Sequence, residues 1–204
     1  MTTDAPPPTD HQATAAETRN VLLAIADLLD ALPAGADADP TPCTDYSVAD
    51  LREHIVSWST AFGAGFRDPG GHAPDAAAVQ VEGTGSAQVR AAGEAIAAGI
   101  AAGGAERDLT LADGNAMPGA MALAMTLWEY QVHGWDLAVA TGQVWAPAPE
   151  AVEGSIGFAE QMLTPDFQGE GLAFAPRVPV PADAPAIERL VGMSGRDPQW
   201  APPA

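Results

Sequence analysis

The stretch from Pro118 to Gly142 constrains the fold more than any other part of this chain. Apolar side chains recur along it at alternating steps of three and four residues, the spacing of one face of an α-helix. These side chains are Met121, Met125, Trp128, Val132, Trp135 and Val139. Pro118 suits a first helical turn, and Gly142 is typical of a helix end. A long helix with one apolar face needs partners to cover it, so the pattern predicts a helical bundle.

Other segments have the same helical periodicity. Thr14 and Glu17 form a capping-box signature that predicts a first helix beginning at Thr14, and Ser47 with Asp50 predicts the start of a second. Three further helices are expected from the apolar spacing, at residues 85–102, 149–163 and 185–193.

These segments together predict an all-α fold. We expect an up-and-down bundle of four principal helices, with an accessory helix and an irregular C-terminal extension. Residues 1–13 are rich in Pro, Thr and Asp and are expected to form a disordered tail. Residues 14–165 are then the bundle, and residues 166–204 an extension that packs on it.

The charge of the chain excludes several classes of function. It has 8 basic and 27 acidic residues, a net charge of −19. Phosphate backbones and anionic membrane surfaces repel such a chain, so we expect no nucleic-acid or membrane partner. One cysteine, Cys43, and the absence of a signal-peptide pattern favour a reducing, cytoplasmic location. The sequence leaves open whether the protein is a monomer or a homodimer.

One group of side chains indicates chemistry. Glu129 and His133 lie four residues apart on the strongest predicted helix, so their side chains share one face. His54, beside the apolar stripe of the second helix, can supply a third ligand, which leaves one coordination position open, as in catalytic zinc sites. Asp136 can accept the second N–H of His133. The alternative is a Glu–His pair that only stabilises its helix, and spacing alone does not decide between the two.

Several motifs carry a resemblance to a known family. Residues 40–54 read PTPCTDYSVADLREH, residues 129–138 read EYQVHGWDLA, and residues 140–142 read ATG. Residues 178–185 (VPVPADAP) and 195–198 (GRDP) follow near the end. In these motifs the sequence resembles the DinB-like metal-binding superfamily. The branch it resembles is related to the N-terminal domain of mycothiol-dependent maleylpyruvate isomerase.

The resemblance implies a site and an activity. It implies a four-helix bundle that binds a divalent metal, usually zinc, through residues that match His54, Glu129 and His133; nickel suits the same ligands. It further implies a low-molecular-weight thiol, held as thiolate, and a small electrophile as substrates. A thiol S-transferase is therefore expected, with a non-catalytic metal-binding bundle as the alternative. The isomerase has an additional C-terminal domain, so maleylpyruvate isomerisation itself is not expected.

Three other residues have a structural and a functional interpretation. Cys43 is a redox thiol, a further ligand or a small buried hydrophobe, and the last is favoured because free cysteine is often buried. Trp128 and Trp135 are first of all residues of the apolar seam, and only secondly residues that stack on a substrate. No individual catalytic residue can be assigned.

The remaining histidines and two of the arginines are expected to lie outside the metal site. His11 and His72 stand among polar, Gly and Pro residues and are expected to be solvated. Arg177 and Arg196 are rare positive charges that can hold a substrate carboxylate. Pairing with a local acid is the favoured role for both.

Overall fold

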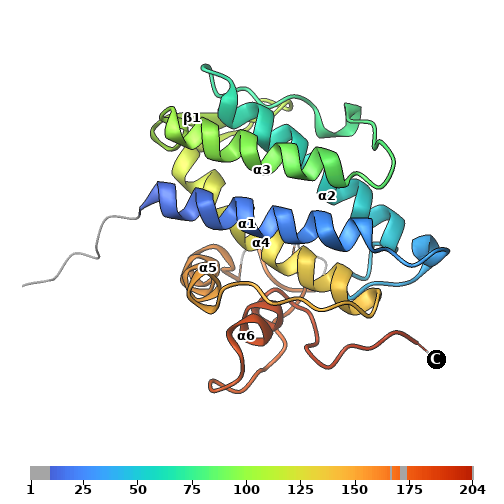
Figure 1. The fold of residues 1–204 in the computed structure, drawn as a ribbon. Coiled ribbons are helices and arrows are strands. Elements are labelled where there is room, and N and C mark those ends of the chain that lie inside the picture. Colours follow the sequence, from blue (N-terminus) through green and yellow to red (C-terminus); the bar gives the residue numbers. More distant parts are fainter. Residues whose placement is uncertain (1–9, 166, 171–173, 204) are drawn as a thin grey trace, which may run out of the picture.

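The computed structural model describes residues 10–165, 167–170 and 174–203 (Figure 1). Within these residues the α-helices are α1 (His11–Asp30), α2 (Val48–Arg67), α3 (Ser86–Ala101), α4 (Gly119–Ala140), α5 (Pro149–Met162) and α6 (Ala186–Met193). Short 3-10 helices are η1 (Ala36–Ala38), η2 (Ala76–Ala78) and η3 (Gly104–Glu106), and two strands are β1 (Asp108–Thr110) and β2 (Ala116–Pro118). The predicted all-α class is therefore confirmed. No helix among the described residues is long and apolar enough to cross a membrane.

The helices α1 to α4 form the bundle, but their order differs from a simple up-and-down arrangement. Helices α2 and α3 run in the same direction, and residues 68–85 return the chain between them (Figure 1). Contacts advance together along both helices: a Cβ added to Gly63 would lie 3.2 Å from Ala92, and one added to Gly99 would lie 2.4 Å from the carbonyl oxygen of Phe66. The up-and-down order predicted from the sequence is therefore wrong, because these two helices are parallel.

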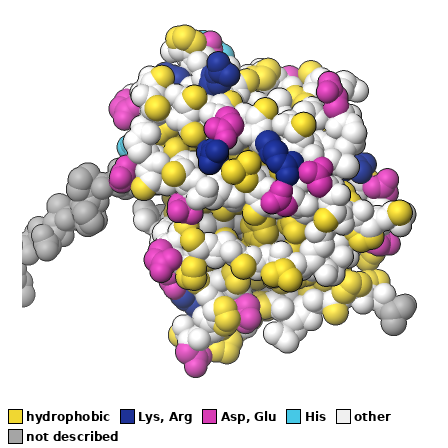
Figure 2. Space-filling model, viewed as in Figure 1, with side chains coloured by type: hydrophobic (Ala, Val, Ile, Leu, Met, Phe, Trp, Pro, Cys, Tyr) yellow, Lys and Arg dark blue, Asp and Glu magenta, His cyan; other side chains and the backbone are white. Residues whose placement is uncertain are grey.

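Helix α1 runs antiparallel to α3 across the bundle. Gln12 donates to the carbonyl of Ile100 at one end, and Arg90 pairs with Asp27 and Asp30 at the other. Figure 2 shows basic and acidic side chains side by side on this face of the molecule. Because these ion pairs are exposed to solvent, they orient the two helices more than they stabilise the bundle.

The start of α1 differs from the prediction. The helix begins at His11, because the side chain of Asp10 accepts from the backbone N–H groups of Gln12 and Ala13. Thr14 does not cap the helix; its hydroxyl donates to the carbonyl of Asp10. The tail expected over residues 1–13 is thus wrong for residues 11–13, and residues 1–9 lie outside the described part.

The other helix boundaries agree closely with the sequence patterns. Ser47 and Asp50 form the expected capping box, in which the two residues satisfy each other's backbone N–H groups. Helices α3, α5 and α6 each begin and end within one residue of the predicted limits. Local spacing and capping chemistry therefore determine these boundaries.

The strands β1 and β2 form a small antiparallel hairpin that the sequence analysis did not predict. The turn between them contains Asp113 and Gly114, and Gly114 has a φ of 87°, which favours glycine. The backbone of Thr110 also bonds to Gly71 and Ala73, which fastens the long α2–α3 connection to the hairpin. The hairpin therefore holds the connection that makes the parallel arrangement possible.

Helix α4 lies at the centre of the molecule. It contacts α1 and α2 on one side and α5 and α6 on the other, so nearly its whole circumference is buried. A second apolar cluster forms where Trp128 and Val132 pack against α5 and against Leu190 of α6. The single apolar seam expected for this helix is therefore too narrow, and its first member, Met121, is 38% exposed.

The contact between α2 and α3 can be tested with a pair of glycine substitutions. Gly99→Ala would place a methyl group 2.4 Å from the Phe66 carbonyl oxygen, and we expect it to lower the free energy of unfolding by about 1–3 kcal/mol through overpacking. The control is Gly157→Ala on α5, where no atom lies within 4 Å of the added Cβ. This variant should gain about 0.5–1 kcal/mol from helix propensity. Urea unfolding measures both, and equal effects would contradict the close approach of α2 and α3.

Candidate metal centre

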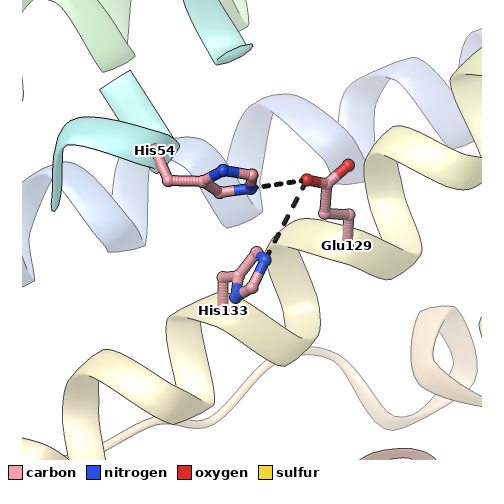
Figure 3. Close-up of side chains that lie close together, drawn as sticks. All are labelled: His54, Glu129 and His133. Atoms are coloured by element: carbon pink, nitrogen blue, oxygen red, sulfur yellow. Dashed lines mark hydrogen bonds and ion pairs between the residues drawn. The ribbon is translucent and has the colours of Figure 1, made fainter. Parts of the chain in front are cut away.

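The structure brings the three predicted ligands together at the α2–α4 interface. His54 projects from α2, and Glu129 and His133 project from successive turns of α4 (Figure 3). One donor atom from each lies within 4.8 Å of the other two. Glu129 Oε1 is 3.0 Å from His54 Nε2 and 4.0 Å from His133 Nε2.

These separations have the size that a metal site requires. Nitrogen and oxygen ligands about 2.1 Å from a tetrahedral zinc ion are roughly 3.4 Å from one another. The observed distances of 3.0 and 4.0 Å from Glu129 lie on either side of that value. Small side-chain adjustments would therefore bring the three atoms to ligand distance from one ion.

A buried carboxylate fixes the orientation of His133. Asp136 is fully buried, and its Oδ2 lies 3.0 Å from His133 Nδ1. Arg196, from the segment after α6, donates to both carboxylate oxygens of Asp136, over 3.3 and 3.1 Å. Asp136 therefore accepts from both neighbours, and the Nδ1 atom of His133 carries the proton.

The charges of this group support that assignment. Burial raises the pKa of the Asp136 carboxyl, but the positive charge of Arg196 and the hydrogen bond from His133 outweigh it, so the pKa lies below its ordinary value. Burial likewise lowers the pKa of the Arg196 guanidinium, and the Asp136 charge more than restores it. Both groups are thus ionised at neutral pH.

The consequence appears on the other side of the imidazole ring. When His133 is neutral, the proton on Nδ1 leaves Nε2 with a lone pair that faces Glu129 Oε1, 4.0 Å away. Burial raises the pKa of Glu129, but the His54 hydrogen bond, the charges of the two histidines in their protonated forms and the charge of Arg196 bring it below the ordinary value. Glu129 is therefore an acceptor as well. A neutral imidazole and an ionised carboxylate are the forms in which these side chains bind a divalent cation.

His54 is held by a residue that the sequence analysis did not single out. The hydroxyl of Tyr46 lies 3.2 Å from His54 Nδ1. While His54 Nε2 donates to Glu129, Tyr46 donates to Nδ1; with an ion at Nε2, the ring would donate to Tyr46 instead. Tyr46 can serve both states because a hydroxyl both donates and accepts.

A pocket of about 320 Å³ opens beside the three ligands. Its lining comprises Cys43, Asp45, Tyr46, His54, Met125, Trp128, Glu129, Val132, His133, Phe174, Ser194 and Arg196. Cys43 is half-buried and lines this pocket, so the expectation of a small core residue is wrong. Burial raises the pKa of its thiol, an effect that the Arg196 charge only partly offsets.

The other predicted residues lie elsewhere or have structural partners. Trp128 lines the pocket, whereas Trp135 is buried in the bundle and does not. His72 is exposed and pairs with Asp68. His11, expected to be solvated, is only 31% exposed and lies 3.9 Å from Glu106.

The two arginines have different partners. Arg196 pairs with an acid, Asp136, as the sequence favoured. Arg177 does not; it donates to the side chain of Gln168 and to the carbonyl of Leu163. Neither arginine is therefore placed as a free receptor for a substrate carboxylate.

Comparison with known proteins identifies the family of the chain. Residues 18–138 match the model of the mycothiol maleylpyruvate isomerase N-terminal domain. The chain belongs to this family. The matched region contains His54, Glu129, His133 and Asp136 and ends before Arg196. The resemblance drawn from the sequence motifs is thus confirmed.

Two similar proteins come from Mycobacterium tuberculosis. They are uncharacterized protein MT0763 of strain CDC 1551 and uncharacterized protein Rv0738 of strain H37Rv. Each is 32% identical over 174 residues, which cover 83% of this chain and 92% of the relative. No solved structure gives a significant match to this chain.

The Asp136–Arg196 pair can be tested by its effect on stability. Arg196→Ala would leave the buried Asp136 charge without its partner, and we expect a loss of about 3–5 kcal/mol at pH 7. Since the charge of Arg196 is the largest cause that lowers the pKa of Asp136, wild type loses this advantage as the pH falls below about 4, and the two proteins should converge. Urea unfolding with a metal chelator present measures the difference. The exposed control Arg177→Ala should cost less than about 1 kcal/mol, and an equal cost for both would contradict the pairing.

Proposed function

We propose that the chain binds one divalent metal ion, zinc foremost, through His54, Glu129 and His133. We further propose that it is a metal-dependent S-transferase that uses a low-molecular-weight thiol of the mycothiol type. The observation that carries the proposal is the convergence of one donor atom each from His54, Glu129 and His133, which lie within 4.8 Å of one another. A bound cation would join these three side chains and fill the space between them.

The donor set fits such an ion. Two imidazole nitrogens and one carboxylate oxygen are typical protein ligands of catalytic zinc, which keeps a further position for water or substrate. Nickel accepts the same ligands. A divalent metal in this place would acidify a coordinated thiol, which then persists as a nucleophilic thiolate at neutral pH.

Other residues of the chain would orient the metal ligands and position the two reactants. Asp136 and Arg196 hold His133 in the tautomer that leaves Nε2 free, and Tyr46 orients His54. The adjoining pocket gives a second molecule room beside the open position. Positioning two reactants side by side supplies a large part of the rate enhancement of a bimolecular reaction.

The thiol reaction also bears on where the protein acts. Reduced thiols persist in a reducing compartment, and Cys43 has no partner cysteine in the sequence. We therefore place the protein in the cytoplasm. A non-catalytic metal, bridging α2 and α4 only to stabilise the bundle, is the alternative that the experiments must separate.

Metal content is the first test. Elemental analysis of protein purified without a histidine tag and reconstituted with zinc should give about one equivalent per chain. His133→Ala should weaken zinc binding by well over tenfold, since even the mutation of residues that only support the ligands lowers metal affinity about 10–100-fold. His72→Ala, an exposed histidine outside the site, should bind like wild type. No stoichiometric metal in wild type would contradict the proposal.

Thiol binding separates the two functions. Cobalt-substituted protein titrated with mycothiol should develop a sulfur-to-cobalt charge-transfer band that saturates at one thiol per chain. Full metal occupancy without this band would support the non-catalytic alternative. For a metal that only stabilises the bundle, removal by a chelator should lower the melting temperature of the protein, and no thiol-dependent reaction should be detected with or without the metal.

A further inference from the structure

The pocket beside the proposed metal ligands has one apolar wall. Met125, Trp128, Val132 and Phe174 form it, and the rings of Trp128 and Phe174 lie with centroids 5.3 Å apart and planes inclined by 32°. Trp128 is fixed by the hydrogen bond from its Nε1 to Ser194 Oγ, 3.1 Å long. A rigid apolar wall of this kind favours a ligand with an apolar or aromatic body.

The described residues that line the pocket offer no free positive charge. Arg196 is the one lysine or arginine that lines it within the described residues. Its Nε and Nη2 atoms donate to Asp136, and its Nη1 atom donates to the carbonyl of Ser194 over 2.8 Å. A substrate carboxylate could recruit Arg196 only by leaving Asp136 buried and unpaired, which is strongly unfavourable.

The remaining charges of the pocket are negative. Asp45 is an exposed carboxylate at its edge, and Glu129, as a metal ligand, would contribute a second carboxylate within it. The charge of a divalent ion would be balanced by Glu129 together with an ionised thiol, so no net positive charge remains to attract an anion. The net charge of −19 on the whole chain opposes the approach of anions further.

We propose that the pocket selects an uncharged electrophile with a small apolar or aromatic body and rejects carboxylate-bearing ones. This inference rests on the proposed function and names the substrate class of the same site. In the reaction, the thiol sulfur bonds to the electrophilic carbon, and the bond from that carbon to its leaving group breaks. The leaving group departs with the bonding electron pair, and the thiol proton passes to solvent. Trp128 and Asp45 are the specificity-determining residues, because they provide the apolar contact and the repulsion.

The test compares two product-like conjugates on the zinc-loaded full chain. S-benzyl mycothiol and S-succinyl mycothiol are titrated by calorimetry, with mycothiol as the reference ligand. We expect the benzyl conjugate to bind at least about tenfold more tightly than the succinyl conjugate, a difference of about 1.4 kcal/mol. Equal affinities, or a preference for the succinyl conjugate, would overturn the inference while mycothiol binding upholds the proposed function. If mycothiol itself fails to bind, both proposals fall.

A charge reversal at the edge of the pocket makes the test specific. Asp45→Lys should raise the affinity for S-succinyl mycothiol about tenfold and leave that for S-benzyl mycothiol within about twofold. Asp183→Lys makes the same change in net charge at an exposed position outside the pocket and should leave both affinities unchanged. An equal response of the two variants would show that only overall charge matters, and the proposed role of Asp45 would be wrong. Zinc content measured on each variant confirms an intact metal site.

Discussion

The buried charge of Asp136 is the constraint on which the rest of the site depends. An ionised carboxylate with no solvent exposure is tolerable only where strong donors surround it, and Arg196 and His133 supply them. The two donors come from different parts of the fold. Arg196 thereby fastens the segment after α6 to α4. His133 is held in the tautomer that has its proton on Nδ1, so that Nε2 is the atom that faces Glu129. One electrostatic requirement thus links packing of the C-terminal segment to the chemistry of the pocket.

Much of the fold could be predicted because it is encoded locally. Apolar spacing identifies α3, α5 and α6 within one residue, and the capping box of Ser47 and Asp50 identifies the start of α2. The start of α1 was misplaced because Asp10 and Thr14 both have capping side chains, and only the folded chain shows which one accepts the backbone N–H groups. The parallel order of α2 and α3 could not be predicted, since helical periodicity carries no information about direction and residues 68–85 are long enough to return the chain.

In the candidate site, too, residues related by a local sequence pattern could be predicted, and those brought together only by the fold could not. Glu129 and His133 could be paired from the sequence because four residues along a helix fix their relation. His54 was found beside the apolar stripe of the second helix, and the family motifs then matched the same three residues. Arg196 lies 60 residues from Asp136, so no local pattern connects them, and its role was only one of two alternatives. Tyr46 was passed over because its loop has no periodicity, although it lies within the motif around His54. What sequence reasoning missed are the residues that hold the ligands in place.

The distance in sequence between Asp136 and Arg196 has a consequence for how the protein is made. During synthesis, α4 and its buried acid emerge before the guanidinium that neutralises it. An unfinished chain can form helical turns, but burying the centre of α4 would then strand an unpaired charge away from water. Closing the bundle around the centre of α4 is therefore less favourable before the later segment arrives. Through the Asp136–Arg196 pair, the last part of the chain thus contributes to the compaction of the part made before it.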